Sequence, residues 1–216
     1  GSVAVPIGDT AAAIWNAVWG RELPQGISRT IILGVRLPRV LATALCGGAL
    51  ALCGAAMQGL LRNPLADGST LGVSAGASLG AVTALLLGIS FPGLPFAGTM
   101  VMAMLFALGS LILILSLAYA ADRGMSTQTI ILMGVVLSMF VTSIVSLLTA
   151  FSGEKLRSIT FWTMGSLSGA GYTETLVLLA ALAVFGGVLL SRADELHAFS
   201  LGEDAARPMG VAVGPG

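Results

Sequence analysis

Residues 36–80 read RLPRVLATALCGGALALCGAAMQGLLRNPLADGSTLGVSAGASLG. Two arginines flank a Leu-Pro pair at the start, and residues 40–61 that follow carry no charge. A helix needs about 20 apolar residues to cross a bilayer, so this stretch is long enough. A polar Asn-Pro turn and a second apolar stretch come next. The segment therefore predicts two membrane helices joined by a tight turn.

The composition of the whole chain also indicates a membrane protein. Of its 216 residues, 56% are hydrophobic and only 9% are charged, against about 25% charged residues in an ordinary soluble domain. A soluble fold with so few charges would expose large apolar patches and associate. The formal net charge is zero, so the chain lacks the basic surplus of a nucleic-acid-binding protein.

Five uncharged stretches predict five spanning helices. The first four are long enough to cross a bilayer, whereas the fifth has only 17 residues and spans only with little tilt or with snorkelling by Arg192. The predicted fold is an all-α, polytopic transmembrane helical bundle. Residues 1–39 are expected to form an interfacial segment, residues 40–191 the bundle, and residues 192–216 a polar coupling segment. The five stretches are residues 40–61, 68–90, 91–121, 124–153 and 175–191.

Glycines recur at every fourth position in the second stretch. Gly72, Gly76 and Gly80, extended by Ala84 and Gly88, would place small side chains along one face of one helix. In lipid, helices associate by close packing along such faces. The pattern predicts a tightly packed bundle and does not by itself indicate transport.

The order of these motifs over about 45 residues resembles the FecCD-type permeases, the membrane subunits of bacterial ABC importers for iron-siderophores, haem and cobalamin. The resemblance implies that Arg36 and Arg39 face the periplasm and dock acidic residues of a substrate-binding protein. Guanidinium groups suit bidentate contact with carboxylates. Anchoring of both arginines to lipid phosphate is the alternative.

Two further turns match the family pattern. Asn63-Pro64 occupies the family's turn motif, although the family usually has proline where this chain has Gly68, and a simple tight hairpin is the alternative. Ser126 and Thr127 resemble the segment that forms the cytoplasmic gate, and helix capping is equally consistent with these hydroxyls.

The helix after the gate would line the translocation path by resemblance, with Met133, Gly134 and Ser138 as candidates; packing in the bundle core is the alternative. Residues 201–210 resemble the coupling segment, a short cytoplasmic helix that contacts the ATPase subunit, and a solvated tail is the alternative. Its candidate coupling residues are Leu201, Gly202, Glu203, Asp204 and Arg207.

The resemblance also implies partners and a location. It predicts a multi-pass protein of the bacterial inner membrane that pairs with a second permease copy, identical or paralogous, and contacts lipid, an ABC ATPase subunit and a periplasmic binding protein. The chain itself is expected to be no enzyme and to hold no cofactor, because its sole lysine, Lys155, lies in no phosphate-binding Gly-Lys-Ser/Thr motif. ATP and Mg²⁺ would bind the partner. Such permeases have about ten helices, so we expect a fragment without the first and the last four.

Charge counts and resemblance give opposite orientations. Six Lys and Arg residues fall on the side that holds residues 1–39, and four on the other side. The positive-inside rule therefore places the first side in the cytoplasm. The resemblance places it in the periplasm, and we adopt that orientation because the counts differ by only two.

Two other functions fit parts of the sequence. Ser74 lies in a Gly-x-Ser-x-Gly pattern, and His197 falls on the same predicted side, as an intramembrane serine protease would require. A nucleophile elbow, however, needs a strand-turn-helix context, whereas Ser74 opens a predicted helix. A non-catalytic membrane anchor is the second alternative.

Overall fold

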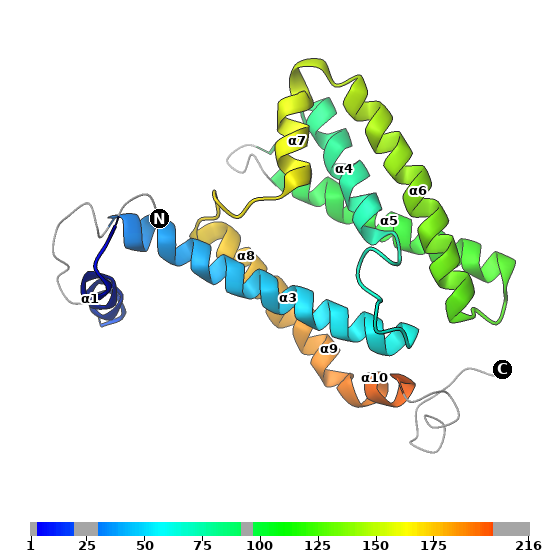
Figure 1. Ribbon diagram of the computed structural model, residues 1–216, viewed down its shortest axis with the longest axis horizontal. Helices are drawn as coiled ribbons and strands as arrows, with labels where there is room; N and C mark the ends of the chain where they lie inside the picture. Colours follow the sequence, from blue (N-terminus) through cyan, green and yellow to red (C-terminus); the bar gives the residue numbers. More distant parts are fainter. Residues whose placement is uncertain (1–3, 20–29, 92–96, 201–216) are drawn as a thin grey trace. The chain divides into compact units, whose positions relative to one another are not determined.

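The computed structural model describes residues 4–19, 30–91 and 97–200, and within these ranges the chain is built from helices (Figure 1). It divides into two compact units, which are described separately below. The first comprises Gly1–Leu52 and Ser166–Ser191, and the second Cys53–Gly165 and Arg192–Gly216. The boundary falls within one long helix, α3 (Leu37–Leu61).

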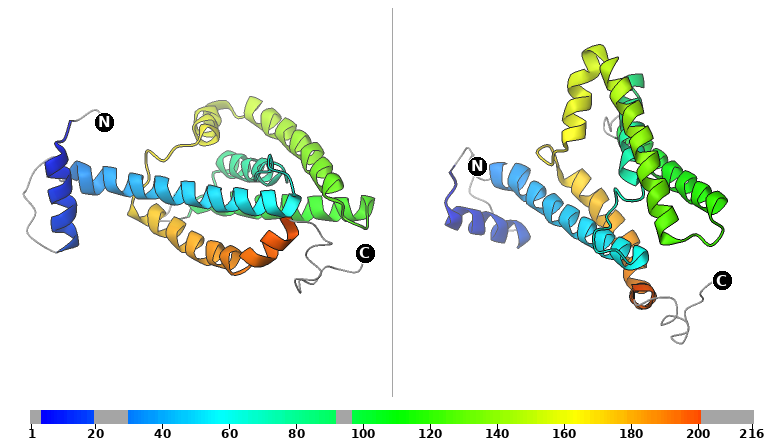
Figure 2. Two further views of the ribbon diagram at one scale, coloured as in Figure 1. Left: turned by 60° about the horizontal axis from the view of Figure 1, so that its bottom comes forward. Right: turned by 45° about the vertical axis from the view of Figure 1, so that its right-hand side comes forward.

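In the first unit, α3 lies beside the helical segment that begins with α8, as the views in Figures 1 and 2 agree. Thr175 Oγ1 donates to Pro38 O at 3.2 Å, and a Cβ on Gly186 would lie 3.3 Å from Leu52 Cδ1. The elements of this unit are α1 (Ile7–Val18), a π-helical turn η1 (Ile32–Arg36), the first part of α3, α8 (Tyr172–Ala181), a second π-helical turn η3 (Leu182–Gly186) and α9 (Gly187–Ser191).

The π-helical turn η1 continues directly into α3, and a side chain from α8 contacts it. π-Helical turns widen the hydrogen-bond ladder and are uncommon outside functional or strained positions. The hydroxyl of Tyr172 donates to Leu33 O, within η1, at 2.6 Å. This bond links the beginning of α8 to the widened turn before α3.

In the second unit, α4 contacts three other helices (Figure 1). Its neighbours are α5, α6 and α7, and the core next to its N-terminus contains Leu61, Ala66 and Leu71. The elements are the end of α3, α4 (Val73–Leu87), α5 (Ala97–Ala121), α6 (Thr127–Ala150), the 3₁₀ turn η2 (Gly153–Lys155), α7 (Leu156–Met164) and α10 (Ala193–Ser200).

Among the residues that the structure describes, four helical segments are long and apolar enough to cross a membrane: Ile32–Leu61, Ala97–Ala121, Thr127–Ala150 and Tyr172–Ser191. The predicted all-α membrane bundle is thereby confirmed. The stretch over residues 175–191, which the sequence left short, belongs to a helix of 20 residues. The helix is longer than the uncharged stretch because it begins at Tyr172, before Glu174. The Glu174 carboxylate accepts from Gly171 N at 2.9 Å and so caps the first turn of the helix.

The second predicted span is shorter than its uncharged stretch. Residues 68–90 have the length of a crossing, but α4 has only 15 residues, about 22 Å at the usual rise of an α-helix. Gly72 before it and Gly88 after it both have left-handed backbone, with φ of 66° and 69°. The prediction that one helix carries all five small residues is therefore wrong at its two ends. Glycine suits these positions because it adopts positive φ without steric cost.

The two glycines inside α4 lie against the backbone of α5. A Cβ on Gly76 would lie 2.7 Å from Phe106 O, and a Cβ on Gly80 would lie 2.8 Å from the carbonyl carbon of Met102. A third glycine, Gly134 in α6, is buried against the backbone of Thr70 in the same way. Side chains at these positions would push the helices apart, so the unit requires glycine there.

We expect Gly80→Ala to destabilise the protein by about 1–3 kcal/mol, because its methyl group would overlap the Met102 backbone and overpacking costs this much. The matched control is Gly109→Ala in α5, where a Cβ would meet nothing within 4 Å. The control should be neutral or slightly stabilising, since alanine favours helix. Thermal unfolding in detergent measures both, and equal unfolding temperatures for the two variants would contradict the packing argument.

Candidate functional site

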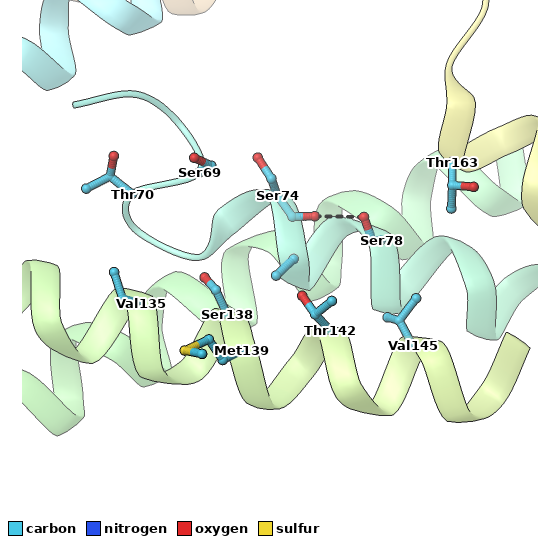
Figure 3. Close-up of a pocket in the computed structure, with 11 residues that line it drawn as sticks. Ser69, Thr70, Ser74, Ser78, Val135, Ser138, Met139, Thr142, Val145 and Thr163 are labelled. Atoms are coloured by element: carbon cyan, nitrogen blue, oxygen red, sulfur yellow. Dashed lines mark hydrogen bonds between the residues drawn. The ribbon is translucent and has the colours of Figure 1, made fainter. Parts of the chain in front are cut away.

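A groove of about 570 Å³ lies among α4, α6, α7 and the turn before α4 (Figure 3). Seven of its eleven lining residues carry a hydroxyl group, and none of the eleven carries a charge. The lining consists of Ser69, Thr70, Ser74, Ala75, Ser78, Val135, Ser138, Met139, Thr142, Val145 and Thr163. The volume is that of a site for an organic ligand.

Helical periodicity places the hydroxyls on facing surfaces. Ser74 and Ser78 are four residues apart on α4, and Ser138 and Thr142 are four apart on α6. Residues at this spacing lie on one side of a helix. Figure 3 shows the two pairs on opposite walls of the groove, with Thr163 of α7 at one end. The groove is thus a polar surface between apolar helices.

The outer side of α5 has the opposite character. Met104, Leu105 and Leu108 have 63%, 58% and 56% of their surface exposed. In a membrane protein, exposed apolar side chains face lipid, and polar ones gather at the bundle interior or at a water-filled cavity. The hydroxyl groove is therefore the part of the second unit suited to contact water or a polar solute.

Asp67 organises a hydrogen-bonded turn that contains the groove residues Ser69 and Thr70. Asp67 Oδ1 accepts from the backbone N–H of Ser69 at 2.9 Å and from that of Thr70 at 3.1 Å. Both hydroxyls also donate to the same oxygen. These bonds, those from the Ser69 side chain first, lower the pKa of Asp67. The carboxylate thus fixes the two groove hydroxyls with their hydrogens directed away from the groove.

A second aspartate organises the turn before α6. Asp122 accepts from Gly124 N at 2.9 Å and from Ser126 N at 3.0 Å, and these contacts hold a turn in which Met125 has a φ of 48°. Hydrogen bonding from Ser126 first, and then from Gly124 N, lowers the pKa of Asp122. This aspartate was absent from the predicted site residues. In the sequence, Asp122 lies four residues before Ser126 and seven before Thr129, where an apolar stretch begins. This spacing could have identified Asp122 as the residue that organises the turn.

The predicted gate residues lie at the start of α6. Ser126 precedes the helix but makes no side-chain bond to its free N–H groups. Its hydroxyl instead bonds to Thr129 Oγ1 at 2.9 Å. Thr127 is the first residue of α6 and is half-buried. Neither residue lines the groove, so their gating role stays a prediction.

The two predicted docking arginines lie at consecutive elements of the first unit. Arg36 is half-buried and ends η1. Arg39 is exposed in α3, and its Nη2 donates to Ser168 O at 2.6 Å. Arg39 therefore also holds the loop before α8. Among the described residues Arg39 makes this bond, and a guanidinium has further N–H groups that can bond to a carboxylate.

The family turn motif forms a tight turn after α3. Asn63 Oδ1 accepts from Leu65 N at 2.9 Å, and Asn63 O accepts from Ala66 N at 3.0 Å. Pro64 follows in an exposed position. These bonds lead the chain to Ala66, which is buried in the core of the second unit.

Of the predicted path residues on α6, the structure places Ser138 in the groove, whereas Gly134 packs against the Thr70 backbone. Met133 is half-buried. Sequence reasoning missed Ser78, Thr142 and Thr163. The spacing of hydroxyls four apart in uncharged helices could have identified the first two. The predicted coupling residues of 201–210 lie outside the described residues.

Lys155 links two elements beside the groove. Its Nζ donates to Leu86 O at 2.7 Å, at the C-terminus of α4, where a cation is favoured by the helix dipole. Lys155 ends η2, which leads into α7. The contact therefore ties the start of α7 to α4, and α7 supplies Thr163 to the groove.

Ser74 lies in the first turn of α4 and follows a hydrogen-bonded turn, without the strand that a nucleophile elbow requires. The Gly-x-Ser-x-Gly pattern is instead explained by packing: Gly72 adopts positive φ and Gly76 contacts α5. The geometry around Ser74 thus does not support the serine-protease interpretation.

A family comparison identifies the chain. The model of the FecCD transport family matches residues 1–215. The chain belongs to the FecCD transport family. It is accordingly a multi-pass membrane protein, and the resemblance seen in its motifs is confirmed.

Known relatives agree with this assignment. The chain is 36% identical over 215 residues to the uncharacterized ABC transporter permease protein YvrB of Bacillus subtilis, covering 99% of this chain and 61% of the relative. It is 36% identical to the molybdate import system permease protein MolB of Haemophilus influenzae and to the cobalamin import system permease protein BtuC of Halobacterium salinarum. These matches cover 94% and 92% of this chain but only 58% and 54% of the relatives.

A solved structure of an ABC transporter, described as of the metal-chelate type and in an inward-facing conformation, superposes with a TM-score of 0.75 at 31% identity. The match covers 94% of this chain and 67% of that one. The chain thus spans about three fifths of the length of the curated relatives it matches, with the same fold over that part.

The lowered pKa of Asp122 predicts a pH dependence of stability. A carboxyl whose pKa is lowered on folding stabilises the protein fully above its ordinary pKa of 3.8, and this contribution is lost as the pH falls through the lower folded value. We expect acidification from pH 7 to pH 3 to lower the unfolding temperature of the wild type more than that of Asp122→Asn. The control is Asp194→Asn, at an exposed carboxylate of α10; a control that matches Asp122→Asn would contradict the assignment.

Proposed function

We propose that the chain is part of the membrane-spanning permease subunit of a binding-protein-dependent ABC importer. The observation that carries the proposal is the uncharged, hydroxyl-lined groove between helices α4 and α6, in a chain whose family is that of such permeases. A polar surface held between apolar helices is what passage of a polar solute through a membrane requires. The permease itself performs no chemistry on the solute.

The mechanism assigned to the protein is alternating access. The groove would form one wall of a central path, and a second permease copy, identical or paralogous, would form the opposite wall. Closure of two ATPase subunits around ATP and Mg²⁺ would rock the two bundles and expose the path to one side of the membrane at a time. The helices move as rigid bodies, since packing such as that of Gly76 and Gly80 against α5 allows little internal deformation.

The relatives support the location and the cargo that we propose. The proposed site of action is the bacterial inner membrane, with lipid against the exposed apolar side of α5. The proposed cargo is an iron-siderophore, haem or cobalamin. The name of the relative from Halobacterium salinarum, which specifies cobalamin import, supports a metal-containing cofactor, and the solved metal-chelate-type transporter supports a chelate.

Coupling to ATP hydrolysis is assigned to residues 201–210. In this proposal Leu201, Gly202, Glu203, Asp204 and Arg207 contact a cleft of the ATPase subunit. A cysteine in place of Glu203 should cross-link to the ATPase in the assembled complex. The matched control is a cysteine in place of Asp9 in α1, which is expected on the other side of the membrane. Equal cross-linking of both cysteines, or of neither, would reject the coupling assignment and with it the importer.

Docking of the binding protein is assigned to Arg36 and Arg39. The double variant Arg36→Glu/Arg39→Glu should abolish transport stimulated by the binding protein, because it replaces two cations by two anions opposite acidic partners. Since Arg39 also holds Ser168 O, the single variant Arg36→Glu leaves that bond in place and should lower stimulation at least tenfold. Arg123→Glu, an exposed arginine in the turn before α6, is the control. Unchanged uptake by Arg36→Glu would defeat the docking assignment.

A further inference from the structure

The helix α1 presents its apolar side to the surface of the protein. Ile7 and Trp15, and Trp19 directly after the helix, have 89%, 58% and 63% of their surface exposed. Ala13, on the opposite side of α1, is buried, with 8% of its surface exposed. A helix that packs on the core of a soluble protein buries its apolar side and exposes its polar side. The orientation of α1 is the reverse, so its apolar side is available to a partner.

The apolar residues of α1 form one continuous surface. Their spacing of three and four residues places on one side of the helix Ile7, Ala11, Ile14 and Trp15. The ring of Trp19 extends this surface, because its centroid lies 5.7 Å from that of Trp15. The sole charged residue from position 7 to position 19 is Asp9, which precedes the buried Ala13 by four residues and so lies on the other side of the helix. The exposed surface is thus aromatic and aliphatic, without a charge.

The contacts of α1 place it at the end of a membrane-spanning segment. It contacts η1, which is the first turn of the segment Ile32–Leu61. The left panel of Figure 2 shows α1 running across the direction of this segment and not along it. Spanning helices are tilted from the bilayer normal by only about 20° on average. A helix that crosses the end of such a segment therefore lies close to the plane of the membrane surface.

We propose that α1 is an interfacial helix that inserts Trp15 and Trp19 among the lipid headgroups beside the segment Ile32–Leu61. Indole rings are enriched at this level of a bilayer, because each combines an apolar body with an N–H donor. Interfacial helices that are attracted to anionic lipid carry Lys or Arg on their polar side, whereas α1 carries Asp9. The partner is therefore a phospholipid surface, whatever its headgroup charge. This contact goes beyond the importer function and does not depend on it.

An anchored α1 restrains the π-helical turn η1 at the membrane surface. Two contacts hold this turn within the first unit: that of α1, and the hydrogen bond from the hydroxyl of Tyr172 to Leu33 O at 2.6 Å. The turn ends at Arg36, one of the two arginines assigned to docking. The lipid contact of α1 thus holds Arg36 at a fixed level relative to the headgroups.

The test measures the depth of both sides of α1 in the membrane. A nitroxide spin label is attached to Ala11→Cys on the apolar side or to Asp9→Cys on the opposite side, at two exposed positions, after the native cysteines have been replaced by serine. The full-length permease is reconstituted alone in phosphatidylcholine nanodiscs. Oxygen concentrates in lipid and nickel-EDDA in water, so the ratio of their collision rates with the label reports its depth. We expect this ratio to be at least about threefold higher at position 11, because the two sides of a helix lie up to about 10 Å apart.

Three results of this measurement would overturn the proposal. Equal ratios at positions 11 and 9 would mean that the apolar side of α1 contacts water. Low collision rates of both reagents at position 11 would mean that a protein surface, such as that of a second permease copy, covers it. The ratio at position 11 should also stay the same when half of the lipid is phosphatidylglycerol. A high ratio in the presence of this anionic lipid alone would contradict a contact that is independent of headgroup charge.

Variants of the two indoles then test whether they hold the helix in place. Trp15→Ser/Trp19→Ser should lower the ratio at position 11 to that at position 9, whereas Trp15→Phe/Trp19→Phe keeps two apolar rings and should keep most of the ratio. The control is Trp162→Ser, which removes an exposed indole of α7 and should leave the ratio at position 11 unchanged. A wild-type ratio in the double serine variant, or an equal loss in the α7 control, would overturn the proposal.

Discussion

The second unit depends on close approach between helix backbones. Lipid supplies little hydrophobic drive between membrane helices, so dispersion forces at short range must hold them together. Gly76 and Gly80 let α4 pack directly against the α5 backbone, and Gly134 does the same for α6 and the turn at Thr70. Because these contacts involve backbone atoms, they fix α4 between its neighbours with little freedom. The position of the hydroxyl groove follows from this packing.

The same helices carry two chemically different surfaces. The buried side of α4 carries Gly76, Gly80 and Ala84, whereas Ser74 and Ser78 lie toward the groove. On α6, Gly134, Ser138 and Thr142 lie along one side at four-residue spacing, where Gly134 packs against the Thr70 backbone and the two hydroxyl residues face the groove. A hydroxyl that bonds to the carbonyl four residues earlier is tolerated in an apolar helix, since its hydrogen is satisfied within the helix. Such residues make a surface polar without placing a charge in the membrane.

Charged side chains act at the ends of helices. Asp67 and Asp122 each gather several hydrogen bonds and shape the turns before α4 and α6. Lys155 bonds to the C-terminal carbonyl region of α4, and Arg39 holds the loop before α8. Each of these contacts lets an ionised group keep its charge outside the apolar stretches while it fixes a connection between helices. The site is in this way positioned by polar contacts at its ends and by glycine contacts along its length.

The sequence alone determined the class of fold, the family and most of the helices. Long uncharged stretches predict membrane helices, because in lipid every backbone N–H and C=O group must find its hydrogen-bond partner within the protein. The sequence also showed the glycine pattern, but it did not show which glycines lie inside a helix. Gly72 and Gly88 are the residues immediately before and after α4. Only the tertiary structure decided which hydroxyls converge. Ser78, Thr142 and Thr163 come from three helices and form one surface only after α4, α6 and α7 pack. The bonds from Ser78 Oγ to Ser74 O and from Thr163 Oγ1 to Ile159 O likewise depend on local geometry that residue types do not encode.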